Sequence, residues 1–472
     1  MLKKVVGFVI VLGCVVYAQV ALSQGEGDLL ENPHAQYVTA YEGTKTCLMC
    51  HTEQAQDVFE SIHYQWKAEA PNIVNANGQE LGKMITTNDF CTNPSISWIA
   101  ILKNKEDKLI ANGCSKCHIG LGLKPAAEES PEQLENIDCL LCHSDNYKRE
   151  VYKTEDETLR WRPVAHDNPE MLLNIAQNVQ GAERTACLAC HATSGGGPNY
   201  KRGDIEPAHA KAERDFDVHM GSGMSCTQCH TVENHKIAGS GTQLAGQDRP
   251  GVNVGCENCH TDAVHATEQL NEHLDTVYCT TCHIPTFAKS LPTDMHRDWS
   301  ASEYLEAKGK YEPHITFEKD VKPAYTWWNG QGKLGLLGEA VELKDGKVML
   351  YEPQGSKDDA ASKIYAFKLH TAKLPIDSKT REFIPIKVGV VFKTGNNDAA
   401  VKKGGEAYSG QAPEAYEWVE TERYLGLFHE VVPKEQALQC ASCHMDGDQL
   451  DWEALGYAGD PMTEGGREVG GE

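Results

Sequence analysis

Residues 256–283 contain the pentapeptide Cys256-Glu-Asn-Cys-His260 and, shortly after it, a second copy, Cys279-Thr-Thr-Cys-His283. The pattern Cys-x-x-Cys-His occurs eight times in the 472 residues. In a c-type attachment site the two thiols bind one haem covalently, and the adjacent histidine reaches the iron. Zinc sites and redox dithiols do not repeat a histidine at one fixed offset, so eight copies exclude them. The motifs therefore predict eight covalent c-type haems and their iron.

The predicted attachment cysteines are Cys47, Cys50, Cys114, Cys117, Cys139, Cys142, Cys187, Cys190, Cys226, Cys229, Cys256, Cys259, Cys279, Cys282, Cys440 and Cys443. The motif histidines, each expected as the proximal iron ligand, are His51, His118, His143, His191, His230, His260, His283 and His444. We number the haems in this order, so haem 2 is attached at Cys114 and Cys117.

The spacing of the motifs predicts the domain organisation. The intervals are irregular, which excludes a solenoid of identical repeats, and a long stretch before Cys440 has no motif. We expect a multihaem c-type cytochrome, mainly α and loop around a packed haem array, with a small β-rich insertion. The expected segments are a signal peptide (1–23), a core with haems 1–7 (24–290), a haem-free insertion with β-hairpins and a helix (291–435), the haem 8 segment (436–462) and a disordered tail (463–472).

Within the haem-free insertion the residue pattern predicts individual elements. Residues 341–350 are expected to form a β-hairpin around Asp345-Gly346, a dipeptide that favours tight turns. Residues 364–369 and 383–392 are rich in β-branched and aromatic residues and predict strands. Residues 413–427 predict a helix.

The N-terminus and the net charge restrict location and partners. Lys3 and Lys4 precede an apolar run to about Ala18, which is typical of a secretory signal and predicts a periplasmic protein. An uncleaved anchor is the alternative; a lipid anchor at Cys14 is disfavoured because the apolar run continues past it. The formal charge of −24 disfavours nucleic acid as a partner. An anionic substrate would need a local basic pocket.

The remaining histidines are candidates for the second axial ligands. Electron-transfer haems usually carry two strong ligands, and 12 of the 20 histidines lie outside the motifs: His34, His63, His166, His209, His219, His235, His265, His273, His296, His314, His370 and His429. His235 and His265 follow a motif histidine by five residues, too few to pass comfortably around their own haem, so we expect them to ligate a neighbouring one. The preferred distal ligands are His63, His166, His219, His235, His265, His273 and His429.

Several segments resemble the octahaem tetrathionate reductase family of c-type cytochromes. The resemblance rests on residues 44–51, 135–143, 217–220, 279–288 and the Trp-Trp-Asn-Gly stretch at 327–330, and on the long gap before the last motif. Octahaem nitrite reductases carry a Cys-x-x-Cys-Lys motif, which this sequence lacks. The tyrosine crosslink on which hydroxylamine oxidoreductases depend has no recognisable local pattern here.

The resemblance implies seven bis-histidine haems and one different haem, haem 2. In that family the distal ligand of haem 2 is a lysine just after the third motif, which corresponds here to Lys148, with Lys153 as the alternative. The family also places a free cysteine near this haem, and Cys91 fits that place. Lys148 and Cys91 are therefore the candidate catalytic residues.

The expected function is a periplasmic reductase that passes electrons along bis-histidine haems to haem 2. Its expected substrate is a small sulfur or nitrogen oxyanion, such as tetrathionate or nitrite, or hydroxylamine. Lys116, Lys124, Lys148 and Arg149 provide local positive charge for an anion. A quinol- or cytochrome-linked donor is the expected electron source, and homo-oligomer formation is left open. The alternative is an electron carrier with eight saturated haems and no catalytic site.

Overall fold

The computed structural model describes residues 32–103, 109–239, 246–261 and 264–467. The predicted signal peptide and the Cys14 position lie outside these residues. Across the described ranges, no helix is both long enough and apolar enough to cross a bilayer.

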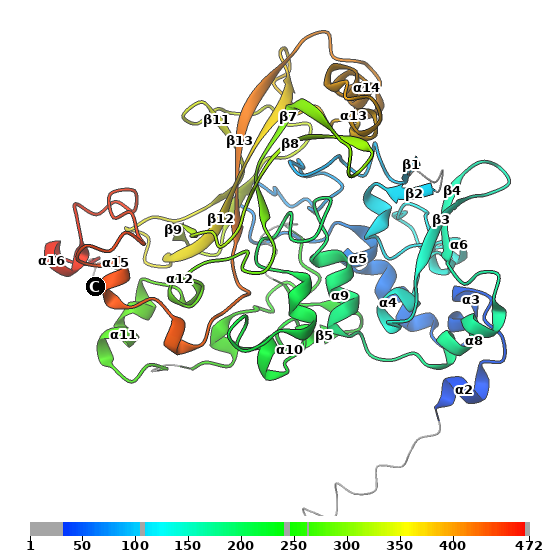
Figure 1. The fold of residues 1–472 in the computed structure, drawn as a ribbon, viewed down its shortest axis with the longest axis horizontal. Helices are drawn as coiled ribbons and strands as arrows, with labels where there is room; N and C mark the ends of the chain where they lie inside the picture. Colours follow the sequence, from blue (N-terminus) through cyan, green and yellow to red (C-terminus); the bar gives the residue numbers. More distant parts are fainter. Residues whose placement is uncertain (1–31, 104–108, 240–245, 262–263, 468–472) are drawn as a thin grey trace, which may run out of the picture.

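The stretch between the last two motifs folds as a seven-stranded sheet, which occupies the upper half of the molecule in Figure 1. The strand order is β10-β11-β13-β12-β7-β8, and β9 also pairs with β12. The strands are β7 (Thr293–Leu305), β8 (Lys310–Glu318), β9 (Ala324–Trp328), β10 (Gly332–Leu334), β11 (Lys347–Pro353), β12 (Lys363–Asp377) and β13 (Tyr416–Gly426). Helix and strand make up 26% and 23% of the structure, so the predicted mainly α architecture is not confirmed.

The predicted helix at 413–427 is wrong, because this segment forms β13. Its buried residues alternate along the chain, Val419, Thr421, Arg423 and Leu425, with more exposed residues between them. A period of two is the signature of a strand with one buried face. β13 pairs with β12 over its whole length, in antiparallel register. The predicted strand at 364–369 is confirmed as part of β12.

The predicted strand at 383–392 is also wrong beyond its first residues. Phe383 bridges to Ile376 of β12. The chain then enters α13 (Val388–Thr394) and α14 (Asn397–Ser409), which pack on the sheet and bury Val391 and Val401. The valines of this segment have a high β propensity, which predicted a strand. They are buried in the core when the segment is helical as well, so packing rather than propensity determined the conformation.

The predicted turn at Asp345-Gly346 is present, with φ of 52° and 80°. These left-handed values are the ones that a two-residue hairpin turn requires. Lys344 and Lys347 exchange backbone hydrogen bonds across it. The strand β11 follows the turn, whereas residues 341–344 before it contribute a single bridge and no strand.

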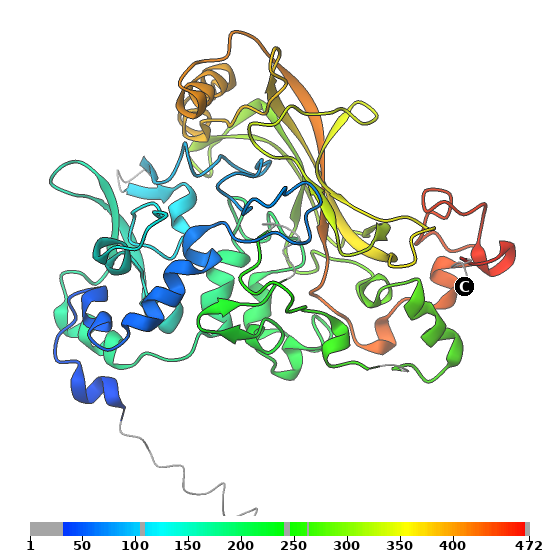
Figure 2. The same ribbon diagram turned by 180° about the vertical axis from the view of Figure 1, so that it is seen from behind.

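The lower half of the molecule consists of short helices and small hairpins. Figure 1 shows them in a row from α3 at one end to α15 at the other, and Figure 2 shows the same row from behind. The helices are α2 (Pro33–Tyr37), α3 (Thr44–Leu48), α4 (Thr52–Glu60), α5 (Ile62–Gln65), α6 (Pro131–Glu135), α7 (Leu140–His143), α8 (Pro169–Gln177), α9 (Arg184–His191), α10 (Cys226–Cys229), α11 (Glu268–Glu272), α12 (Cys279–His283), α15 (Cys440–Cys443) and α16 (Pro461–Glu464). The hairpins are β1–β2 (Ala100–Lys103, Leu109–Asn112), β3–β4 (Arg149–Lys153, Leu159–Pro163) and β5–β6 (Val232–Glu233, Lys236–Ile237).

The C-terminal segment contains the short helix α16 (Pro461–Glu464), which overlaps the tail predicted to be disordered from residue 463; that prediction is not tested. Asp460 caps α16 by accepting from the N–H of Met462. Beyond the helix, Arg467 donates to the Ser362 carbonyl at 2.6 Å and lies 5.1 Å from the ring centre of Trp327. These contacts fix the chain on the strand β9; residues 468–472 lie outside the described part.

Candidate haem-binding and catalytic site

Seven of the eight motif histidines face a second histidine across a gap of nearly constant width. The pairs, with the distance between ring centres, are His51–His34 (6.0 Å), His143–His235 (6.3 Å), His191–His63 (6.2 Å), His230–His429 (6.3 Å), His260–His219 (6.1 Å), His283–His265 (6.4 Å) and His444–His273 (6.2 Å). Two imidazoles that share one iron, each with an iron–nitrogen bond of about 2 Å, have their ring centres about 6 Å apart. The spacing therefore fits bis-histidine haems at these seven motifs, which we call the paired motifs.

Six of the seven preferred distal histidines lie in these pairs. His235 follows the fifth motif but faces His143 of the third. His265 follows the sixth motif but faces His283 of the seventh. Each thus contributes to the site of another haem, as the short spacing predicted.

The seventh preferred histidine, His166, does not face a motif histidine in the described chain. Its Nε2 lies 3.1 Å from Asp167 and its Nδ1 lies 3.6 Å from Glu150. His34 takes the place opposite His51. It lies in α2, which begins at Pro33 and is capped by Asn32. The Asn-Pro pair before His34 is a helix-start signal that sequence reasoning missed.

Contacts between motif cysteines give the order in which the attachment sites adjoin. Thiols lie within hydrogen-bond reach in the pairs Cys47–Cys139, Cys117–Cys190, Cys187–Cys226 and Cys256–Cys279. The second site therefore adjoins the fourth, and the fourth adjoins the fifth. His63, the partner of His191, also lies near His118. The fourth site is thus the link between the second site and the others.

The second motif differs from the paired motifs in the role of its histidine. His118 is 0% exposed, and its Nδ1 accepts from the N–H of Gly120 at 2.9 Å. In the neutral ring the proton then lies on Nε2, which donates to the Tyr64 carbonyl at 2.7 Å. Burial lowers the pKa of His118 to about 3, so the ring is neutral. Both nitrogens are engaged by the backbone here, and the role of His118 as proximal ligand of haem 2 stays a prediction.

Aromatic rings and an arginine hold His118 in this position. The ring centres of Trp98, Tyr64 and Trp66 lie 4.8, 5.0 and 5.5 Å from that of His118. Arg149 at the start of β3 donates to the His118 carbonyl at 2.7 Å and lies 3.4 Å from the Asp138 carboxylate. Arg149 thus braces the motif and is not available to an incoming anion.

The two lysines predicted as ligands of haem 2 both lie at the surface. Lys148 precedes β3 and is exposed, while its neighbour Arg149 points toward the motif. Lys153, the alternative, is exposed and pairs with Glu157. The role of either residue at haem 2 stays a prediction.

Two half-buried lysines were not singled out from the sequence: Lys83 lies beside the second motif, and Lys201 lies beside Phe90 and near Lys83. The Nζ of Lys83 lies 4.8 Å from the ring centre of Trp66, close enough to act on the thiols of Cys114 and Cys117. The Nζ of Lys201 lies 5.7 Å from the ring centre of Phe90, and burial lowers its pKa to about 7. Neither ammonium has a hydrogen-bond acceptor among the described residues. The sequence alone does not indicate which lysines lack a hydrogen-bond acceptor in the folded protein.

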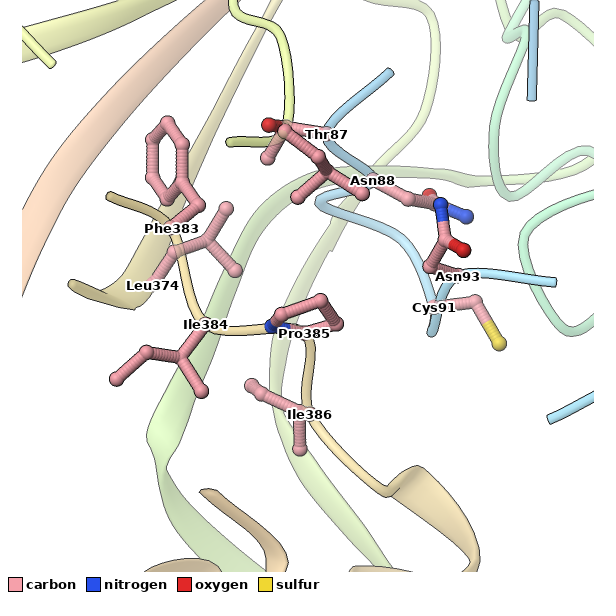
Figure 3. Close-up of a pocket in the computed structure, with 10 residues that line it drawn as sticks. Thr87, Asn88, Cys91, Asn93, Leu374, Phe383, Ile384, Pro385 and Ile386 are labelled. Carbon is pink, nitrogen blue, oxygen red and sulfur yellow. The ribbon is translucent and has the colours of Figure 1, made fainter. Parts of the chain in front are cut away.

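Cys91 lies near Lys83 and near Cys114 of the second motif. It borders a small cavity lined by side chains such as Leu374, Phe383 and Ile386, but Figure 3 shows its sulfur directed away from them. The thiol is close enough to Cys114 for a charge on one to affect the other. Burial raises the pKa of Cys91. Cys91 thus lies near the second motif, where burial favours its neutral thiol.

Comparisons with known proteins identify the class to which the chain belongs. A family model described as bacterial cytochrome c matches residues 288–447. An uncharacterized protein of Archaeoglobus fulgidus is 35% identical over 250 residues, which cover 46% of this chain and 82% of that protein. The crystal structure of an octahaem cytochrome c from Shewanella oneidensis matches with a TM-score of 0.73 and 33% identity, over 91% of this chain and 98% of that chain. The chain therefore belongs to the octahaem c-type cytochromes.

Proposed function

We propose that this protein is a periplasmic reductase with eight haems, seven that carry electrons and one, haem 2, where substrate reacts. The observation that carries the proposal is the contrast between seven motif histidines that face a second histidine and His118, whose nitrogens are both engaged. A haem with two histidine ligands is saturated and suits electron transfer. A site without that pair leaves a coordination position for substrate.

We further propose that Lys201, in place of Lys148, supplies the axial amine at haem 2. An amine must be neutral to bind iron, and a pKa lowered to about 7 makes a large fraction of Lys201 neutral near neutral pH. Its Nζ has no competing acceptor in the described chain. Lys368 donates to the carbonyls of Tyr200 and Lys201, each at 3.0 Å, which fixes the backbone that carries the amine. If a haem is attached at Cys114 and Cys117, the Lys201 amine would be a residue that holds its iron, and the iron would supply electrons to the substrate.

The substrate class follows from the charge around this site. Lys83, Arg297 and Lys310 place positive charge near Cys91, and this local excess offsets the −24 of the whole chain for a small anion. Haem iron supplies electrons and a binding position when it is present. The candidate reactions are reduction of tetrathionate to thiosulfate, and of nitrite or hydroxylamine to ammonia. For tetrathionate, the deprotonated thiolate of Cys91 would attack a sulfur of the S–S bond in a thiol–disulfide exchange.

The electron path is inferred from the neighbouring attachment sites. Cys117 adjoins Cys190, so haem 4 is the donor to haem 2. The helices α3 and α15, which carry cysteines of the first and eighth motifs, lie at the two ends of the row of motif helices in Figure 1. We propose that a quinol- or cytochrome-linked donor delivers electrons at one of these ends.

The alternative function is an electron carrier with eight saturated haems. It requires a histidine pair at every motif, and His118 has none among the described residues. The test is electron paramagnetic resonance of the oxidised protein. We expect seven bis-histidine signals and one haem of different ligation, and eight matching bis-histidine signals would rule out the reductase. Turnover assays with tetrathionate, nitrite and hydroxylamine then identify the substrate.

A further inference from the structure

A buried ion pair joins Arg149 to Asp138 among the first four attachment motifs. The two side chains are 5% and 1% exposed, and Nη1 of Arg149 lies 3.4 Å from Oδ2 of Asp138. A guanidinium keeps its charge at every ordinary pH. Burial raises the pKa of Asp138 to about 6, so at pH 7 most of the carboxylate is ionised as well. The pair is therefore a fixed dipole inside the row of motifs.

The positive end of this dipole faces the second and fourth motifs. Arg149 donates to four backbone carbonyls of the second-motif loop 115–120, at distances from 2.7 to 3.2 Å. Cys190 of the fourth motif lies against the same loop, with its sulfur 3.8 Å from the Cys117 carbonyl. The guanidinium is close enough for its charge to act on both thiols. The second and fourth motifs thus lie on the cationic side of the pair.

The negative end faces the first and third motifs. Asp138 directly precedes Cys139, the first cysteine of the third motif. The carbonyl before it, that of Ile137, accepts from Thr44 at the start of α3, the helix that carries Cys47. The carboxylate is close enough for its charge to act on the thiols of Cys47 and Cys139. The first and third motifs thus lie on the anionic side of the pair.

A dipole in this position changes how easily the haems on its two sides are reduced. A haem gains negative charge when it takes up an electron, so a nearby cation favours the reduced form and a nearby anion disfavours it. Salt screens a buried pair much less than a pair at the surface. The third and fourth motifs adjoin, since Cys142 is close enough to Cys190 for a charge on one to affect the other. The dipole therefore lies across the step from the third motif to the fourth.

We propose that the Arg149–Asp138 pair makes haems 2 and 4 easier to reduce than haems 1 and 3, and so directs electrons from haem 1 toward haem 2. The direction rests on the proposed function, because it takes haem 2 as the place where substrate reacts, whereas the order of the potentials does not. Each transfer moves one electron from a reduced to an oxidised haem, so the pair changes only the equilibrium between them. The quinol- or cytochrome-linked donor then delivers electrons at the end of the row that carries the first motif.

The test is a potentiometric titration of the full-length protein with its haems, above pH 7, followed by optical absorbance and electron paramagnetic resonance. Haem 2 is identified by its own spectroscopic signature. Arg149→Met should lower the midpoint potential of haem 2 by about 59 mV or more, a tenfold change in the ratio of reduced to oxidised form. Arg149→Lys, which keeps the charge but not the four contacts, should keep most of that potential. Asp138→Asn should act in the opposite direction and move part of the optical titration curve to higher potential.

The matched control is Arg162→Met, on the same hairpin. Arg162 lies on β4, is partly exposed and pairs with Glu150 at 3.0 Å. Its removal should leave the midpoint potential of haem 2 unchanged, and a fall equal to that of Arg149→Met would overturn the inference.

The signs of the shifts separate an effect of charge from a loss of structure. An unchanged haem 2 in Arg149→Met overturns the inference, and so does an equal fall in Arg149→Lys. If Arg149→Met does not accumulate with its haems, Asp138→Asn decides, because its amide oxygen can still accept from Tyr147 and Arg149. A fall or no change in that variant overturns the inference. Eight matching bis-histidine signals in the wild-type protein would overturn the proposed function instead, and the optical titrations of the variants would still test the order of the potentials.

Discussion

The paired motifs and the second motif share the sequence Cys-x-x-Cys-His and differ in what their histidines do. In the paired motifs His143 and His230 contact backbone carbonyls through Nδ1, at 2.8 and 3.0 Å. That contact fixes the ring with Nε2 facing the opposite histidine, as it does in many metal sites. At His118 the roles of the nitrogens are reversed. The motif therefore determines where a haem is attached, but its surroundings determine which ligands the iron receives.

The largest test of this difference is Lys201→Ala. Removal of an axial amine at the reacting haem should lower kcat by about 100-fold or more. The seven bis-histidine signals should stay unchanged, because the paired motifs do not use Lys201. Turnover of tetrathionate, nitrite and hydroxylamine measures the effect.

The matched control for that variant is Lys148→Ala, which removes an exposed lysine of the same length. It should turn over every substrate at the wild-type rate. A loss of activity in Lys148→Ala with normal activity in Lys201→Ala would reverse our assignment.

A second test sharpens the description of the paired motifs. His34→Ala should abolish one bis-histidine signal, that of haem 1, because His34 faces His51 at 6.0 Å. His166→Ala should abolish none, since His166 contacts Glu150 and Asp167. Counting low-spin signals per chain distinguishes the two variants. Loss of a signal in His166→Ala alone would restore the prediction made from the sequence.

The pH dependence of haem 2 provides a third test. Lys201 must lose its proton to bind iron, and its pKa is lowered from the usual value to about 7, mainly by burial. The amine-bound form should therefore increase as the pH rises toward 7 and decrease below it, by about tenfold per pH unit once the ammonium dominates. Iron binding itself favours the neutral amine and moves the midpoint below 7. The paired haems should show no change over this range, which a spectroscopic pH titration can follow.

Six of the histidines preferred from the sequence lie opposite a motif histidine, and for His235 and His265 the short spacing already indicated a neighbouring motif. Haem attachment and iron ligation stay predictions. The sequence did not predict His34, Lys83 or Lys201, since these residues reach their positions only through tertiary contacts. It also predicted a helix at 413–427 where β13 forms. Buried and exposed residues alternate between Val419 and Leu425, but the sequence does not show this, because one of the buried residues is the charged Arg423, which pairs with Asp89. A buried ion pair of this kind is visible only when both partners are placed.

The smallest expected effect comes from moving the His118 ring. A Cβ added at Gly120 would lie 2.7 Å from Cε1 and 2.8 Å from Nδ1 of His118, and 2.5 Å from Nδ2 of Asn136. Gly120→Ala should therefore lower the free energy of unfolding by about 1–3 kcal/mol, a typical cost of overpacking. Since His118 does not bind iron in our assignment, the signature of haem 2 should persist in the folded variant. Denaturant unfolding followed by the same spectra measures both effects. A haem 2 that changes its ligation in Gly120→Ala would show that His118 is a ligand after all, and that the second motif is more like the paired motifs than its geometry indicates.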